Sequence, residues 1–235
     1  MLKTNEFICN GKRLTDLPFY VVCEVLAPPT RSDKKNILTE LPFVNGVVVQ
    51  DVDAYSTVPK EYAFYLHDVT SSDVRKFKAF FPDRGEFTPY DEPDLRFIYE
   101  SVHLSFSVLD NVGGYEVTAT FTCQPFAYEE EKTMMLGSTL TNHTNAPMHP
   151  KLKITGKTGS ETYLKIGEQI MKFKEIQDVI YIECKHRHQD AYSSGGKKVN
   201  QYVKGDFFEI PVGTHRVEKG QGISSVEITT RWCWR

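Results

Sequence analysis

The stretch YEVTATFTC, from Tyr115 to Cys123, decides the fold class of this chain. Its odd-numbered residues are apolar and the residues between them are polar, which is the pattern of a strand with one buried face. The preceding run of Leu104, Phe106 and Val108 alternates with polar residues in the same way. A turn-forming segment at 110–114 joins the two runs, so we predict an antiparallel β-hairpin here.

A short helix is predicted upstream of this hairpin, near residues 72–82. We expect Ser71 or Ser72 to cap it, Asp73 to favour its first turn, and Pro82 to end it. Its apolar face is formed by residues at helical spacing, namely Val74, Phe77, Phe80 and Phe81.

The composition changes after Tyr128, where a polar run and a turn-rich stretch place a domain boundary between about 129 and 147. We assign 1–133 to an N-terminal β-domain that carries the helix, and 134–235 to a C-terminal β-sandwich. The fold class is therefore mainly β. Strands in the second half are expected at 151–155, 163–166, 170–173, 179–184 and 226–234, and an exposed loop at 185–206.

The overall composition is that of an ordinary globular protein. Hydrophobic residues make up 40% and charged residues 25%, and the net charge of −3 argues against a general nucleic-acid binder. The five cysteines are scattered and odd in number, which predicts reduced, buried thiols. The sequence has no apolar run of about 18 residues and no signal-peptide pattern, so we expect no membrane insertion.

Motifs that would indicate chemistry are weak. Gly156-Lys157-Thr158 lacks the upstream glycine of a phosphate-binding loop, and a strand pattern follows it. His186 and His188 are spaced to share one strand face, but no third metal ligand has matching spacing. We therefore predict no catalytic residue, no metal and no cofactor, and so no enzyme.

Trp232 and Trp234 allow two interpretations. Their alternation with polar residues, continuous with Val226 and Ile228, favours a place in the sandwich core. Exposed together on a sheet face, the same two rings would stack on sugars.

Several segments, in order along the whole chain, resemble the siphophage distal tail protein family. They are the opening strand and turn FICNG (7–11), the strand FTCQPFAY (121–128) that closes a first domain, PKLKITG (150–156) at the start of a second, GDFFEIPVG (205–213) and the terminal TRWCWR (230–235).

This resemblance implies an N-terminal β-domain with one helix, a galectin-like C-terminal sandwich, and a homohexameric ring at the distal end of the tail tube. The ring would join the tail tube protein to the tail-associated lysin or fibre hub, with a receptor-binding protein as a further partner. It would be a virion structural protein of the tail tip and baseplate hub, assembled in the bacterial host cytoplasm and serving host attachment. DNA would pass through the lumen without specific binding.

Two surfaces are candidates for contacts. An apolar ring interface is expected at Phe43, Val47, Val49, Tyr62 and Phe64. These segments can equally be central strands of a sandwich. A partner-docking loop is expected at Lys185, His186, His188, Tyr192, Lys197, Lys198 and Tyr202.

Two other classes of function remain as alternatives to the structural role. A carbohydrate-binding module for host-surface glycans is the main one, since the chain is rich in aromatic residues. A peptidoglycan-degrading enzyme is disfavoured, because the sequence shows neither paired acids nor zinc ligands.

Overall fold

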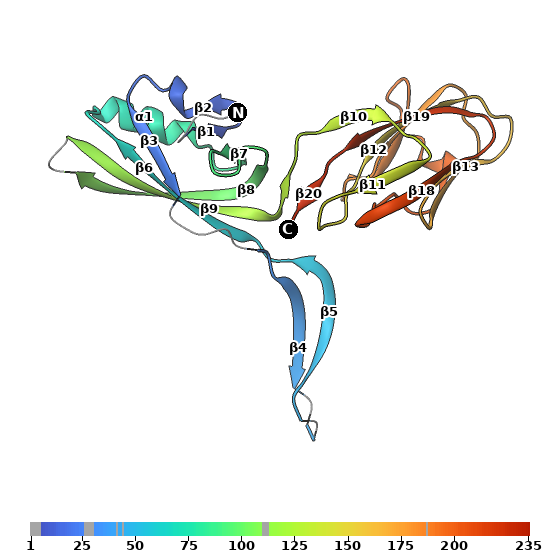
Figure 1. The fold of residues 1–235 in the computed structure, drawn as a ribbon, viewed down its shortest axis with the longest axis horizontal. Coiled ribbons are helices and arrows are strands. Elements are labelled where there is room, and N and C mark those ends of the chain that lie inside the picture. The colour runs from blue at the N-terminus through green and yellow to red at the C-terminus, as the bar shows by residue number, and fades with distance from the viewer. Residues whose placement is uncertain (1–5, 26–30, 41, 44, 110–112, 187) are drawn as a thin grey trace. The chain divides into compact units, whose positions relative to one another are not determined.

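The computed structural model describes residues 6–25, 31–40, 42–43, 45–109, 113–186 and 188–235 (Figure 1). The chain divides into two compact units, the first comprising 1–128 with Arg235 and the second Glu129–Trp234. This division lies upstream of the boundary predicted between 133 and 134. The reason is that strand β10 (Lys132–Met135) already pairs with β19 (Ile223–Thr230) of the second unit.

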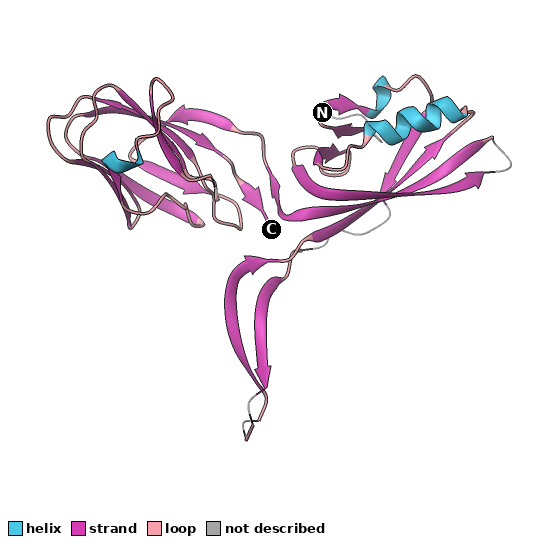
Figure 2. Ribbon diagram, turned by 180° about the vertical axis from the view of Figure 1, so that it is seen from behind, coloured by secondary structure: helices cyan, strands magenta, loops and turns pink. Residues whose placement is uncertain are grey.

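Unit 1 is an antiparallel sheet in which the strands follow the order β2-β1-β7-β8-β9-β6-β3. Helix α1 lies over one face of this sheet (Figure 2). The elements are β1 (Phe7–Cys9), β2 (Lys12–Arg13), the 3-10 helix η1 (Leu14–Asp16), β3 (Val21–Val25), β4 (Lys34–Glu40), β5 (Val47–Tyr55), β6 (Val58–Leu66), α1 (Ser71–Phe80), β7 (Gly85–Pro89), β8 (Arg96–Leu109) and β9 (Gly114–Tyr128).

The predicted hairpin is confirmed as β8 and β9, which pair over their length. Val117, Ala119 and Phe121 are buried, whereas the residues between them are only partly buried, as the alternation requires. Residues 110–112 of the predicted turn lie outside the described residues.

An aromatic core joins the sheet of unit 1 to its helix. The ring of Phe7 lies 5.0 Å from that of Phe87 and 5.4 Å from that of Phe64, between ring centroids. It also contacts the rings of Tyr62, Phe81 and Phe121. The helix contributes Phe77, which lies against Phe64. These edge-to-face and stacked contacts add to the stabilisation from apolar burial.

The helix begins one residue earlier than predicted. Thr70 is the N-cap, because its hydroxyl accepts a hydrogen bond from the backbone N–H of Asp73 at 3.3 Å, and the Asp73 carboxylate accepts one from the Thr70 N–H at 3.1 Å. This reciprocal capping box uses Asp73 at the third helical position. The prediction of Ser71 or Ser72 as the cap was therefore wrong.

Strands β4 and β5 form a separate two-stranded sheet, which extends away from the main sheet of unit 1 (Figures 1 and 2). We call β4 and β5 with their connection the arm. Every residue of β4 is exposed, and so are Val47, Val48 and Val49 of β5. Register places Leu38 opposite Val49, so apolar side chains gather on one face of the arm, and no second layer among the described residues covers them.

Unit 2 is a β-sandwich of two antiparallel sheets, with strand orders β10-β19-β12-β15-β16 and β11-β18-β13-β14-β17. Its elements are β10, β11 (Thr139–Asn142), β12 (Lys151–Gly156), β13 (Thr162–Ile166), β14 (Gln169–Phe173), β15 (Val179–Glu183), β16 (Asp190–Ser193), the 3-10 helix η2 (Asn200–Tyr202), β17 (Val203–Lys204), β18 (Gly213–Lys219), β19 and β20 (Cys233–Trp234).

The sandwich core is mainly aliphatic. Leu152, Ile154 and Ile182 from the first sheet pack with Leu164 and Phe173 from the second. Trp232 is only 6% exposed and belongs to this core, which confirms the core interpretation for that residue. Trp234 is partly buried, and its Nε1 donates to Glu129 Oε1 at 2.9 Å.

We expect the substitution Phe7→Ala to lower the free energy of unfolding of unit 1 by about 3–5 kcal/mol, because it leaves a cavity among five aromatic rings. Urea denaturation followed by tyrosine fluorescence measures the change. The matched control is Val108→Ala on β8, outside the candidate ring interface, which should shift stability by less than about 1 kcal/mol because that side chain is largely exposed. Equal effects of the two variants would contradict this account of the core.

Candidate binding site

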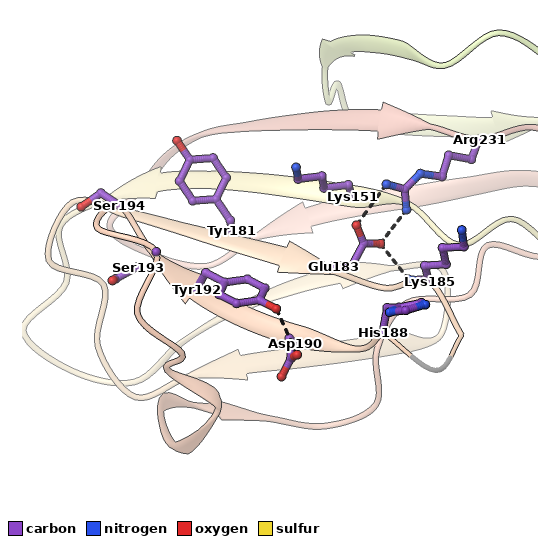
Figure 3. Close-up of a pocket in the computed structure, with 11 residues that line it drawn as sticks. Lys151, Tyr181, Glu183, Lys185, His188, Asp190, Tyr192, Ser193, Ser194 and Arg231 are labelled. Carbon is purple, nitrogen blue, oxygen red and sulfur yellow. Dashed lines mark hydrogen bonds and ion pairs between the residues drawn. The ribbon is translucent and has the colours of Figure 1, made fainter. Parts of the chain in front are cut away.

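An open groove of about 700 Å³ lies on the outer face of the first sheet of unit 2 (Figure 3). It is formed by outward-facing residues of β12, β15 and β16, together with the turn after β16 and Arg231. Strand alternation creates this face: Ile154 and Ile182 point into the core, so Lys151, Tyr181 and Glu183 point outward.

Strand register brings the lining residues together. Tyr181 lies directly opposite Tyr192, and Glu183 lies opposite both Lys151 and Asp190. Directly paired residues on one sheet face have Cβ atoms about 5 Å apart, so these side chains are close neighbours.

A bidentate ion pair closes one end of the groove. Arg231 donates from Nη1 to Glu183 Oε1 at 2.5 Å and from Nη2 to Glu183 Oε2 at 3.0 Å, and its Nε donates to Glu131 at 3.2 Å. Burial by itself raises the pKa of Glu183, but the hydrogen bonds from Arg231 and from the Lys185 backbone N–H outweigh it and hold that pKa below its usual range.

Asp190 organises the other end of the groove. Its carboxylate accepts hydrogen bonds from Lys198 Nζ at 2.7 Å, Asn200 Nδ2 at 2.9 Å and the Tyr192 hydroxyl at 3.0 Å. These donors, Lys198 foremost, lower the pKa of Asp190 to about 2. Asn200 also accepts from the Ala191 backbone N–H at 2.6 Å, so the chain that returns from β16 is fastened to that strand.

The residues of the predicted docking loop are only partly a loop. Lys185, His188 and Tyr192 line the groove, whereas His186, Lys197 and Tyr202 are exposed elsewhere. Part of 185–206 is strand β16, whose Ala191 is fully buried in the core. Sequence reasoning missed Lys151, Tyr181, Glu183 and Arg231 as groove residues, although strand alternation already placed Lys151, Tyr181 and Glu183 on an outward face.

The predicted ring-interface residues fall into two groups. Phe43, Val47 and Val49 are exposed on the arm, where they can contact a partner. Tyr62 and Phe64 are 1% and 0% exposed in the aromatic core, where no neighbouring subunit can reach them. Tyr62 and Phe64 therefore lie on a central strand of the sheet, which was the alternative to the ring interface, and only Phe43, Val47 and Val49 remain interface candidates.

Other reactive groups do not assemble into a site among the described residues. No three His, Cys, Asp or Glu side chains gather there in an arrangement that could hold a metal ion. All five cysteines are buried and free, and burial raises the pKa of Cys123, Cys184 and Cys233 to about 12. Such thiols stay protonated near neutral pH and are poor nucleophiles.

No described helix combines the length and the apolar character required for crossing a membrane.

Comparison with known proteins identifies a similar fold. The structure superposes on the crystal structure of the Dit protein of phage SPP1, described as a paradigm of the hub adsorption apparatus in phages that infect Gram-positive bacteria. The TM-score is 0.71 and the identity 17%, and the match covers 96% of this chain and 97% of that one. No family model matches the sequence, and no curated protein matches it. The resemblance to the distal tail protein family is thus confirmed at the level of the fold.

Acidification should loosen the turn that Asp190 fastens. Because the pKa of Asp190 is lowered by folding, its stabilising contribution is complete above its unfolded pKa, and it is lost as the pH falls from about 4 to 2. We expect hydrogen exchange of the Ala191 and Ser193 amides, corrected for intrinsic rates, to accelerate several-fold in that range. The variant Asp190→Asn should lose this pH dependence, and the same dependence in the variant would show that another group is responsible.

Proposed function

We propose that this chain is a structural component of a siphophage tail tip or baseplate, where six copies form a ring that joins the tail tube to the tail-associated lysin or receptor-binding apparatus. The observation that carries the proposal is the fold match to SPP1 Dit, which extends over nearly the whole of both chains. Within the virion the ring has the tail tube protein on one side and the lysin, fibre hub or receptor-binding protein on the other.

The arm supports an assembled state. An isolated two-stranded hairpin is marginally stable in water, and this one exposes Ile37, Leu38 and three consecutive valines. At its end, Phe43 is fully exposed and has a backbone φ of 70°. That left-handed conformation costs a bulky residue about 1–2 kcal/mol, and no burial offsets it within the single chain.

A second copy of this chain is the occupant that fits the arm. Rings with cyclic symmetry close through one repeated heterologous interface, so each subunit offers a projecting element and a receiving surface. Permanent interfaces of this kind are rather apolar. The apolar face that Leu38, Val47 and Val49 form on the arm has this character.

The ring lumen is proposed to be neutral or acidic. DNA has to pass without binding, and a lumen of lysines and arginines would retain phosphates strongly. The chain as a whole carries 31 acidic against 28 basic residues, which agrees with such a lumen.

The purified chain is expected to form a ring of six subunits, detected as a hexamer mass in light scattering and as particles with a central hole in negative stain. The double variant Val47→Asp/Val49→Asp should remain monomeric, because it places charges on the apolar face of the arm. Its circular dichroism spectrum should match that of the parent, which shows that the monomeric variant is folded.

A matched control is Ile170→Asp, which changes an exposed apolar residue on unit 2 and should leave the hexamer intact. The proposal for the arm is wrong if the arm variant still forms hexamers.

The assembled ring should show no measurable retention of double-stranded DNA at about 50 mM salt, where basic surfaces bind DNA tightly. Electrophoretic mobility of labelled DNA mixed with the ring measures this. Retention that weakens steeply with added salt would contradict a neutral or acidic lumen.

A further inference from the structure

The groove of unit 2 carries an excess of positive charge on a chain that is acidic overall. Its lining contains the cations Lys151, Lys185 and Arg231 against the carboxylates Glu183 and Asp190. Glu183 is engaged by Arg231, and Asp190 is engaged by Lys198. Among the described residues, neither Lys151 nor Lys185 forms an ion pair through its ammonium group, so both remain available to an anion.

Two aromatic rings lie beside these cations. Tyr181 and Tyr192 are directly paired across β15 and β16, and both are only partly buried. Figure 3 shows them on the same face of the sheet as Lys151 and Glu183. Half-exposed tyrosines provide flat apolar surface with a polar edge, which suits ligands that combine an apolar ring face with hydroxyl groups.

The groove is held in place before any ligand arrives. Hydrogen bonds fix the Tyr192 hydroxyl to Asp190, and two parallel hydrogen bonds fix Arg231 to Glu183. Lys153, the neighbour of Tyr181 on β12, is likewise paired with Glu227 at 2.7 Å. A site whose side chains are already ordered loses little conformational freedom on binding.

We propose that this groove binds a saccharide that bears an anionic group, with a sugar ring against Tyr181 or Tyr192 and the anion beside Lys151 and Lys185. Sugar hydroxyls would find donors and acceptors in the fixed Arg231–Glu183 pair. The proposal goes beyond the structural role of the chain and does not depend on ring formation. Either a carboxylate or a phosphate supplies the negative charge that the two lysines require. The experiment therefore uses one saccharide of each kind.

The test is isothermal titration calorimetry of the full chain with four probes. Tetragalacturonate carries carboxylates, pentamannose 6-phosphate carries a phosphate, cellotetraose is neutral, and inorganic phosphate supplies the anion without the sugar. We expect one of the two charged saccharides to bind with a Kd of about 1 mM or below. Cellotetraose and inorganic phosphate should each bind at least about tenfold more weakly, because each lacks half of the recognised chemistry.

Variants test the contribution of the lysines separately from that of the tyrosine ring. Lys151→Gln with Lys185→Gln should weaken binding of the charged saccharide about tenfold, because charge-assisted contacts are lost. Tyr181→Ala should weaken binding roughly threefold to tenfold, whereas Tyr181→Phe should keep it, because the ring remains. The melting temperature of each variant confirms that unit 2 is folded.

A matched control lies on the opposite sheet of the sandwich. Tyr163 on β13 is paired with Lys172 on β14, and both are exposed. The double variant Tyr163→Ala/Lys172→Gln therefore removes a tyrosine and a lysine from a surface outside the groove. It should leave binding unchanged.

Several results would overturn the proposal. Equal affinity for cellotetraose would remove the charge requirement, and equal affinity for inorganic phosphate would leave only an ion site. Loss of binding in the control variant as large as in the groove variants would place the ligand elsewhere. The absence of binding by both charged saccharides at roughly 10 mM would also overturn it, and would leave the groove to a protein partner.

Discussion

The ring of Phe7 fixes the architecture of unit 1. It belongs to the first strand of the chain, yet it contacts rings from β6, β7 and β9 and the ring of Phe81, which directly follows α1. This aromatic core therefore ties together segments far apart in sequence and clamps the helix onto the sheet. Strand β6, which contributes Tyr62 and Phe64 to the core, follows two residues after β5. The core thus also anchors the base of the arm, whose outer part packs against no second layer among the residues that the structure describes.

Unit 2 follows a different physical rule. Its core is filled by aliphatic residues at alternate positions of two sheets, so each strand must present its remaining residues to the outside. Strand β12 lies beside β15, which is three strands further along the chain and pairs in turn with β16, and the outward residues of the three strands line one groove. Core packing therefore determines where the groove lies, whereas its charges and aromatic rings depend on which residues occupy the outward-facing positions.

Local sequence patterns predicted the features that depend on neighbouring residues in the chain, namely which face of a strand or helix is buried. Period-two alternation predicted the buried face of β9, and helical spacing predicted that Phe77 and Phe80 face the core. The apolar runs around Val48 and Phe64 look alike in sequence, yet the first is exposed and the second is buried. The difference depends on whether a second layer covers each strand, which only the tertiary structure decides. The groove also escaped prediction, because it depends on the order of strands in the sheet, which places β12 beside β15 and makes Lys151 the neighbour of Glu183.

The exposed arm makes the lone subunit vulnerable to aggregation. Within the described part of the chain, β4 pairs only with β5, so its other side is the edge of a two-stranded sheet, where strands of other chains can add. The apolar pair Ile37 and Leu38 on β4 is flanked by Lys34, Lys35 and Glu40. Charges at both ends of such a segment act as gatekeepers against parallel, in-register pairing of identical strands, since that arrangement brings like charges together. The strand can thus present apolar side chains to a specific neighbouring subunit, while its flanking charges disfavour parallel pairing with other copies of β4.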